Sequence, residues 1–222
     1  MIQVALESHL AELRVALVEA SGVRIEAAGA ELRQLCDAAA RAAPGVMAGG
    51  DARRQAVRRL LRAGGFKPSG RNKPAQEYLL RTAIEAGQLP AISNAVDLIN
   101  LVSLRSGLPI SLVSLDRISA PLALRIGAAG ERFVFNRTGQ ELDVAGLLCI
   151  CAASPAGGDP VATPVKDSMR AKVNEQDQHL LACVYASHEA VSAEELSSWA
   201  DELAAGFQRF CGAAHVEKGS LP

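Results

Sequence analysis

The spacing of apolar residues changes once along this 222-residue chain, and that change constrains the fold more than any other feature. Between residues 27 and 105, apolar side chains recur every three to four positions, which is the period of an amphipathic helix. From residue 110 onward, short apolar runs of period two are separated by turn residues such as Gly130 and Gly139. A helical half followed by a strand-rich half favours an α+β fold.

The same pattern sets the expected elements. Strands are expected at residues 2–6, 13–20, 110–115, 122–126, 132–135, 147–152 and 180–186. Helices are expected at 27–43, 51–63, 74–86, 94–105 and 193–210. Pro44 is expected to end the first, and the fourth is expected to have Ser93 or Asn94 as its cap and Gly107 as its end. The Gly- and Pro-rich stretch 154–168 is long for a connection and indicates a functional loop, whereas the tail 216–222 is expected to fray. We therefore expect one domain with a curved sheet or β-sandwich-like core and flanking helices.

Bulk properties exclude several classes of protein. Hydrophobic residues make up 49% and charged residues 21%, as in a folded globule. No stretch reaches the roughly 18 uninterrupted apolar residues of a membrane span, and the first residues do not resemble a secretory signal. Five cysteines without framework spacing suggest thiols in a reducing compartment, and Cys149 and Cys151 are expected to be buried small hydrophobes. The four histidines form no ligand-spaced pair, so we expect a cytoplasmic protein without metal or cofactor.

Charge is distributed unevenly along the chain. The segment from Arg53 to Arg81 contains nine Lys or Arg residues and one acidic residue, Glu77. Its net charge is therefore +8, and that of the rest of the chain is −9. Arg54, Arg58 and Arg62 follow one another at i, i+4 and i+8 and predict an outward basic stripe on the second helix. A segment of this charge favours a phosphate-rich partner over a merely solvated helix face. The expected contacts to that partner are Arg54, Arg58, Arg62, Lys67, Arg71, Lys73 and Arg81.

Standard catalytic motifs are missing. The loop from Gly65 to Asn72 imitates the glycine spacing of a phosphate loop, but Arg71 replaces the lysine, Asn72 replaces the hydroxyl residue, and a helix precedes it. The sequence has no G-x-S-x-G elbow and no dinucleotide fingerprint. Nucleotide binding and nucleophilic catalysis through these motifs are therefore not predicted.

Short motifs in a fixed order carry a more specific signal. They are Lys73-Pro74…Glu77…Leu80-Arg81, Leu89-Pro90-Ala91-Ile92, Asn94…Val96-Asp97…Asn100…Ser103-Leu104, Gly107-Leu108-Pro109-Ile110, Leu115-Asp116-Arg117-Ile118, and Thr163 to Ser168 with Arg170 and Lys172. Over about residues 55–190 this order resembles the tRNA-editing domain of the phenylalanyl-tRNA synthetase beta chain (the B three-four domain) in a free-standing form. The resemblance divides the single domain into a strand and helix extension at 1–50, an editing-like core at 51–190 and a docking helix at 191–212.

The resemblance implies hydrolysis of the ester that joins a wrong amino acid to the 3′ adenosine of a tRNA. Carried over to this sequence, it implies the catalytic residues Asn100, Ser111, Asp167 and Ser168 and the substrate-binding residues Asn94, Pro109, Ile110, Thr163 and Lys166. Asn100, Ser111 and amides of the 163–168 loop are candidate oxyanion donors, because an activated ester needs only a positioned water and such donors. Asp167 could bind the α-amino group and Lys166 the terminal phosphate. For each of these residues, capping or turn formation is the competing interpretation.

Two positions depart from the family. The family's pocket histidine falls at Ser111, and the glutamate that recognises the tyrosine hydroxyl falls at about Ala182. Loss of a buried hydroxyl partner removes strong discrimination, so the resemblance does not predict selection of tyrosine here. The sequence thus favours a deacylase acting in trans on mischarged tRNA. Two alternatives remain: a non-catalytic tRNA- or RNA-binding module and a small-molecule binding protein. The amino acid, the tRNA and the oligomeric state are left open.

Overall fold

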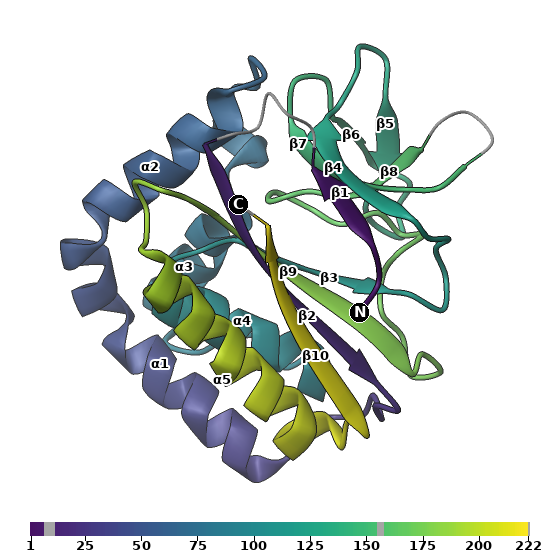
Figure 1. Ribbon diagram of the computed structural model, residues 1–222. Helices are drawn as coiled ribbons and strands as arrows, with labels where there is room; N and C mark the ends of the chain where they lie inside the picture. The colour runs from purple at the N-terminus through teal and green to yellow at the C-terminus, as the bar shows by residue number, and fades with distance from the viewer. Residues whose placement is uncertain (7–11, 155–157, 222) are drawn as a thin grey trace.

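A computed structural model describes residues 1–6, 12–154 and 158–221, and it has an α+β architecture (Figure 1). One sheet has the order β1 (Val4–Leu6), β4 (Leu122–Ile126), β7 (Leu148–Ala152), β8 (Asp159–Ala162). A second has the order β10 (His215–Leu221), β2 (Leu13–Ser21), β9 (His179–Ser187), β3 (Ile110–Ser114), and β5 (Arg132–Val134) pairs with β6 (Glu141–Asp143). The helices are α1 (Ala30–Gly49), α2 (Asp51–Arg62), α3 (Ala75–Ala86), α4 (Asn94–Ser106) and α5 (Ala193–Cys211), with a 3₁₀ turn at Gly70–Asn72.

Strand β9 lies inside the second sheet, and its alternating side chains define the two cores. Leu181, Cys183 and Tyr185 belong to a buried cluster that also contains residues of β4 and β7. Ala182 and Val184 point the other way, into a cluster shared with the helices. Because successive side chains of a strand alternate between faces, one sheet can separate a sheet-on-sheet core from a sheet-on-helix core. This arrangement confirms the expected sandwich-like sheets with flanking helices.

The helix that connects the N-terminal half to β3 is fixed at both ends by residues that the sequence singled out. Ser93 caps α4 by accepting a hydrogen bond from the Val96 amide, and Gly107 ends it in the left-handed conformation at φ 68°. A residue with a Cβ is disfavoured at that φ, which explains the glycine. Pro109 then starts the turn into β3, and its carbonyl accepts from the Tyr185 amide at 3.0 Å. The helix end therefore sets the register of β3 on β9.

Three details of the expected secondary structure are wrong, and strand β6 was not expected. Helix α1 continues through Pro44, which is exposed; the ring removes one backbone hydrogen bond, but the preceding turn stays docked through buried Ala40 and Ala43. The stretch 154–168 is only partly a loop, because Asp159–Ala162 forms β8 against β7. The tail does not fray: His215–Leu221 is β10, antiparallel to β2. Backbone hydrogen bonds to the edge of β2 order the tail as a strand, although its sequence has no apolar pattern that predicts one.

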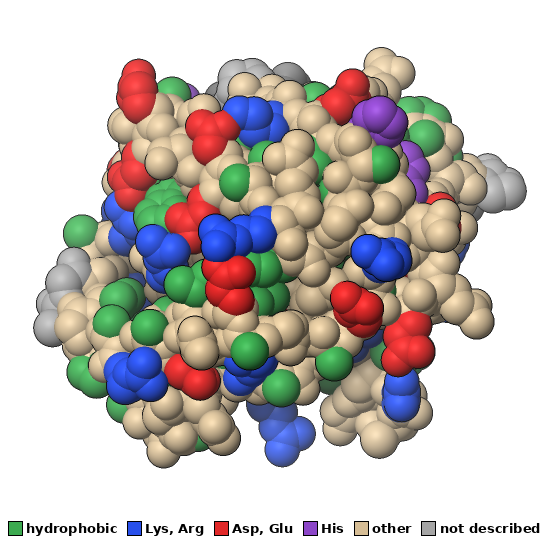
Figure 2. All heavy atoms as spheres, turned by 90° about the horizontal axis from the view of Figure 1, so that it is seen from below, with side chains coloured by type: hydrophobic (Ala, Val, Ile, Leu, Met, Phe, Trp, Pro, Cys, Tyr) green, Lys and Arg blue, Asp and Glu red, His purple; other side chains and the backbone are tan. Residues whose placement is uncertain are grey.

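Acidic residues pair with much of the basic segment in the folded chain. Arg58 forms a two-point pair with Glu77 at 2.6 Å for each contact, and Arg53 and Arg59 pair with Glu195 and Glu189. The outward stripe predicted on α2 is therefore wrong in part: Arg54 and Arg58 are half-buried and ion-paired, and Arg62 alone of the three is exposed. On the face in Figure 2, basic and acidic side chains are likewise interspersed. Sequence position had separated charges that the fold brings together.

Candidate functional site

A buried group of polar side chains lies where β3 and β9 meet the turn after β8. We call Ser111, Thr163, Asp167 and Tyr185 the Ser111 cluster. The Tyr185 hydroxyl donates to Ser111 Oγ at 3.0 Å, and Ser111 Oγ donates to the Thr163 carbonyl at 3.0 Å. Ser111 is opposite Cys183 in the β3–β9 ladder, so both point toward the sheet-on-sheet core. Four polar residues in an apolar core are a costly arrangement unless they are paired or functional.

Asp167 is the ionisable member of the cluster. Its Oδ2 accepts a long hydrogen bond of 3.3 Å from the Leu112 amide, and its buried Oδ1 has no partner among the described residues. Burial raises the pKa of this carboxyl to about 6, against the opposing effect of Ser111 and the Leu112 amide. A carboxyl with a pKa near neutrality and an oxygen without a partner is able to accept a proton from water. Asp167 is therefore a candidate general base.

A tight turn holds Asp167 in place. Thr163 Oγ1 accepts from the amides of Val165 and Lys166 and donates to the Lys166 carbonyl at 2.8 Å, so its side chain is fully used in shaping the turn. Ser168 Oγ accepts from the Arg170 amide at 3.2 Å, which shapes the next turn. The Ala75 amide at the start of α3 donates to the Pro164 carbonyl at 2.9 Å. The structure therefore shows Thr163 and Ser168 forming turns, which was the alternative to a functional role for these residues.

Cations without an acidic partner occur in this turn and in the segment before α3. Lys166 Nζ lies 3.9 Å from the centroid of the Phe135 ring, and both burial and the nearby Arg71 charge lower the pKa of Lys166. Arg71 and Lys73 come from the segment that precedes α3, and Lys67 comes from the same segment. Within residues 1–6, 12–154 and 158–221, none of Lys67, Arg71, Lys73 and Lys166 forms an ion pair. We call these four the loop cations. Two mutually repelling cations held close together form a site suited to a phosphate.

The other residues implied by the resemblance are less directly connected to the cluster. Asn94 is 1% exposed, and its amide is saturated: Oδ1 accepts from the amides of Glu26 and Ala95, and Nδ2 donates to the carbonyls of Arg24 and Phe210. It has no group left for a substrate. Ile110 faces the helices and Pro109 is buried. Asn100 is half-buried on α4, and its side chain makes no hydrogen bond within the described part of the chain.

Sequence reasoning missed Tyr185. It is fully buried, its hydroxyl orients Ser111, and burial raises its pKa. The available signal was a hydroxyl-bearing residue in the otherwise apolar strand HLLACVYAS, two positions after Cys183. Because alternation places residues 183 and 185 on one face, Tyr185 belongs to the face that Ser111 occupies on β3. The approximate position of the family's selecting glutamate, Ala182, lies on the opposite, helix-side face.

The cysteines and the other potential metal ligands form no second site in the described part of the chain. All five cysteines are buried, none forms a disulfide, and desolvation raises the pKa of Cys149 and Cys183. Cys149 and Cys151 both lie in buried β7, as expected of small hydrophobic residues. Among the residues that the structure describes, no group of three His, Cys, Asp or Glu side chains is placed to hold a metal ion. In the same residues, none of the helices has the length and apolar character needed to cross a bilayer.

The fold and the ordered motifs define a class. The chain belongs to the B3/4 domain family, whose profile matches residues 59–218. Among solved structures it is similar to an N-terminal fragment of the phenylalanyl-tRNA synthetase beta-subunit from Pyrococcus horikoshii, with a TM-score of 0.52 and 9% sequence identity. That similarity covers 100% of this chain and 54% of the fragment, so this chain spans about half the length of its structural neighbour. A search of curated proteins finds no match. The family confirms the resemblance, and at this identity the neighbour shows the fold alone.

Proposed function

We propose that this protein hydrolyses the aminoacyl ester at the 3′ end of mischarged tRNA, acting in trans. One observation carries the proposal: Asp167 presents a carboxylate oxygen without a partner among the described residues, at a pKa of about 6, next to Ser111 and one residue after the loop cation Lys166. Membership of the B3/4 family supports a tRNA-related role. The pairing of a proton acceptor with a phosphate-binding surface suits a substrate in which a reactive ester follows a phosphodiester chain.

The proposed reaction needs no covalent enzyme intermediate. Asp167 Oδ1 takes a proton from a water molecule while the water oxygen bonds to the ester carbonyl carbon. The Ser111 hydroxyl turns from the Thr163 carbonyl toward the developing oxyanion, and the carboxamide of Asn100 is a second candidate donor. The tetrahedral intermediate then breaks its bond to the ribose oxygen, which recovers the proton from Asp167. Amino acid and uncharged tRNA leave. Because Oδ1 is shielded from solvent, the Thr163–Ser168 turn has to move for substrate to enter.

The loop cations hold the tRNA in this proposal. Arg71 and Lys166 lie close enough for the Arg71 charge to lower the pKa of Lys166, and a phosphate between them would relieve that repulsion. Lys67 and Lys73 extend the surface along the chain before α3. A side-chain preference broader than tyrosine is part of the proposal, since Ala182 offers no hydroxyl partner.

Single-turnover deacylation across a panel of mischarged tRNAs tests this function. We expect wild-type turnover on at least one ester and a loss of about 10²-fold or more in Asp167→Asn, because the proton acceptor is removed. Ser111→Ala should lose about 10²–10³-fold if it donates to the oxyanion. Asp159→Asn is the matched control: this carboxylate lies on nearby β8, pairs with Arg170 and should keep the wild-type rate.

A specific observation also favours a second function. The buried position of Asp167 Oδ1 and the serine at the position of the family's histidine suit a binding module that retains the fold without catalysis. Folded wild-type protein that binds tRNA but turns over no ester in the panel would replace the hydrolase with this module. Wild-type rates in Asp167→Asn would remove Asp167 from the mechanism.

A further inference from the structure

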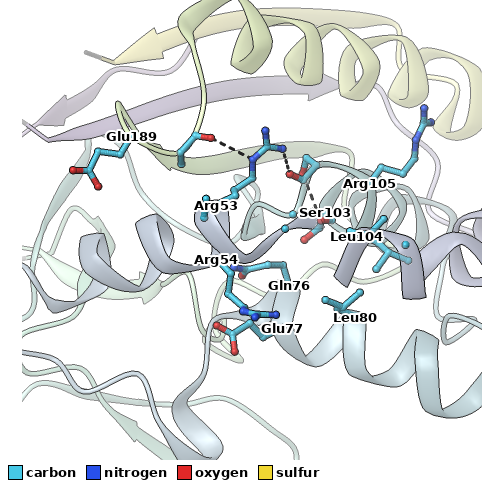
Figure 3. Close-up of a pocket in the computed structure, with 16 residues that line it drawn as sticks. Arg53, Arg54, Gln76, Glu77, Leu80, Ser103, Leu104, Arg105 and Glu189 are labelled. Atoms are coloured by element: carbon cyan, nitrogen blue, oxygen red, sulfur yellow. Dashed lines mark hydrogen bonds between the residues drawn. The ribbon is translucent and has the colours of Figure 1, made fainter. Parts of the chain in front are cut away.

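A cavity of about 440 Å³ lies away from the Ser111 cluster, where the end of α1 and the start of α2 meet α3 and the end of α4 (Figure 3). No member of the Ser111 cluster and none of the loop cations lines it. Its apolar wall includes Val46, Leu80 and Leu104. The volume falls within the range of about 300–1,000 Å³ that is typical of small-molecule sites.

Gln76 is the polar side chain that this cavity leaves unexplained. It is 5% exposed, lines the cavity from the first turns of α3, and both its Oε1 and its Nε2 are buried without a partner among the described residues. A buried amide normally pairs both groups, since each unpaired one costs stability. An amide presents a donor and an acceptor side by side. Its natural complement is another planar edge with a neighbouring acceptor and donor.

Most charges at the cavity are already committed. Arg53 donates to the carbonyls of Ala190 and Ser106 (Figure 3). Arg53 also pairs with Glu195, and Glu77 is held by Arg58. The guanidinium of Arg54 differs, because its pairing carboxylate belongs to Asp51 one turn earlier, which is 71% exposed. An exposed pair of this kind is weak and its acid can be displaced. An anionic ligand could therefore replace Asp51 as the partner of Arg54.

The start of α2 reinforces the same position. Gly50, at the N-cap of this 12-residue helix, also lines the cavity and provides no side-chain cap. The first amides of a helix point outward and attract negative charge. The start of α2 and Arg54 thus line the same cavity as Leu104 of α4, and the unpaired Gln76 amide supplies an independent polar anchor.

We propose that this cavity is a binding site for a small organic anion that carries an amide-type edge. The anionic group binds Arg54 and the start of α2, and the remaining body of the ligand contacts Val46, Leu80 and Leu104. The amide-type edge pairs with Gln76 after its side chain turns into the cavity, because both of its polar atoms are shielded from solvent. Two sources share this chemistry: an N-acylated amino acid, with a peptide group and a carboxylate, and a nucleoside monophosphate, with a base edge and a phosphate. The site is separate from the proposed ester hydrolysis and does not depend on it.

Titration followed by ¹⁵N–¹H NMR tests the site on the intact protein. The probes are N-acetylleucine and adenosine monophosphate, with acetate and N-methylacetamide as single-group controls. We expect one linked probe to shift the Gln76 side-chain amide signal saturably below about 5 mM, with either control alone binding at least tenfold more weakly. The probe that saturates identifies the source. Absence of saturation by both linked probes overturns the proposal.

Two variants separate a ligand site from a merely structural amide. Gln76→Leu has a similar volume and removes two unpaired polar groups, so we expect an unchanged or higher melting temperature together with at least tenfold weaker probe binding. Arg54→Gln should weaken binding of the same probe by about tenfold, whereas Arg105→Gln, which replaces a cavity-lining arginine paired with Glu202, should not. A destabilised Gln76→Leu with unchanged probe binding would mean that water satisfies the amide, and the inference would be wrong.

Discussion

The carboxyl of Asp167 makes a specific contribution to the pH dependence of stability. Its pKa in the folded chain is raised from 3.8 to about 6, so the native state binds this proton more tightly than the unfolded state. That contribution to stability is fully present below pH 3.8 and is lost as the pH rises through about 6. Asp167→Asn lacks the titration. We expect its unfolding free energy, relative to wild type, to rise by up to about 3 kcal/mol between acidic and neutral pH.

Denaturant unfolding of both proteins at about pH 4, 5, 6 and 7 measures this difference. Asp177→Asn is a useful comparison, since Asp177 is also buried but accepts from the Asn174 amide and pairs with Arg117. A constant offset between Asp167→Asn and wild type over the whole range would mean that Asp167 titrates normally, and its candidacy as a base would fail with it.

Arg58 illustrates how a residue's role can change between sequence and structure. The sequence predicted contact with RNA, but Glu77, with its side chain 10% exposed, binds the guanidinium at two points and raises the pKa of Arg58. Removing one member of a largely buried pair leaves an unpaired charge. We expect Arg58→Ala to lower the unfolding free energy by about 2–3 kcal/mol, and Arg59→Ala, in an exposed pair with Glu189, by less than about 1 kcal/mol.

Thermal and denaturant melts check this prediction. Replacing Arg58 and Glu77 singly and together gives a double-mutant cycle. Arg58→Leu with Glu77→Leu should recover much of the stability that Arg58→Ala loses, because neither charge is then left buried alone. If Arg58→Ala melts like wild type but binds tRNA much more weakly, the original assignment of Arg58 to the RNA surface is right after all.

At the scale of elements, the sequence predicted what local chemistry determines. The ends of α4 followed from Ser93 and Gly107, and β4 was predicted at its observed bounds, Leu122–Ile126. Elements that depend on distant partners were missed: β8 is ordered by β7, and β10 by β2. The candidate site shows the same division. Ser111 and Asp167 could be named from ordered motifs, whereas Tyr185 and the raised pKa of Asp167 depend on how β3, β9 and the turn pack.

Strand β10 should matter despite its polar sequence. It pairs with β2 from His215 opposite Ser21 to Leu221 opposite Val15, and so covers one edge of the second sheet. Truncation after Ala214 would expose that edge to pairing with other chains. We expect the truncated protein to melt at a lower temperature and to self-associate in light scattering, with truncation after Ser220 as the control. A monomeric, equally stable truncation would show that β10 does not protect β2.

At the scale of the whole molecule, the distribution of unpaired charge decides where an RNA can bind. The +8 segment in the sequence is partly neutralised on folding, because acidic residues outside the segment pair with Arg53, Arg54, Arg59 and Arg81. Arg58 pairs with Glu77, which the value of +8 already includes. Within the described residues Arg62 at the end of α2 and Lys67, Arg71 and Lys73 before α3 retain no ion pair, and Lys166 from the turn after β8 is likewise without one. The expected RNA surface therefore moves from the length of α2 toward the Thr163–Ser168 turn.

The salt dependence of tRNA binding measures how many of the loop cations contact phosphates. If the four loop cations each neutralise one phosphate, the logarithm of the tRNA association constant should fall against the logarithm of salt concentration with a slope of about −3. Replacing Arg71 and Lys73 together with Gln should halve the slope, because two counterions fewer are released. Arg59→Gln and Arg81→Gln, which remove exposed but paired charges, should leave it almost unchanged. Fluorescence anisotropy with labelled tRNA at several salt concentrations measures each slope. A slope that is unaffected by Arg71 and Lys73 but flattened by Arg54→Gln and Arg62→Gln would return the RNA to α2 and separate it from the proposed catalytic cluster.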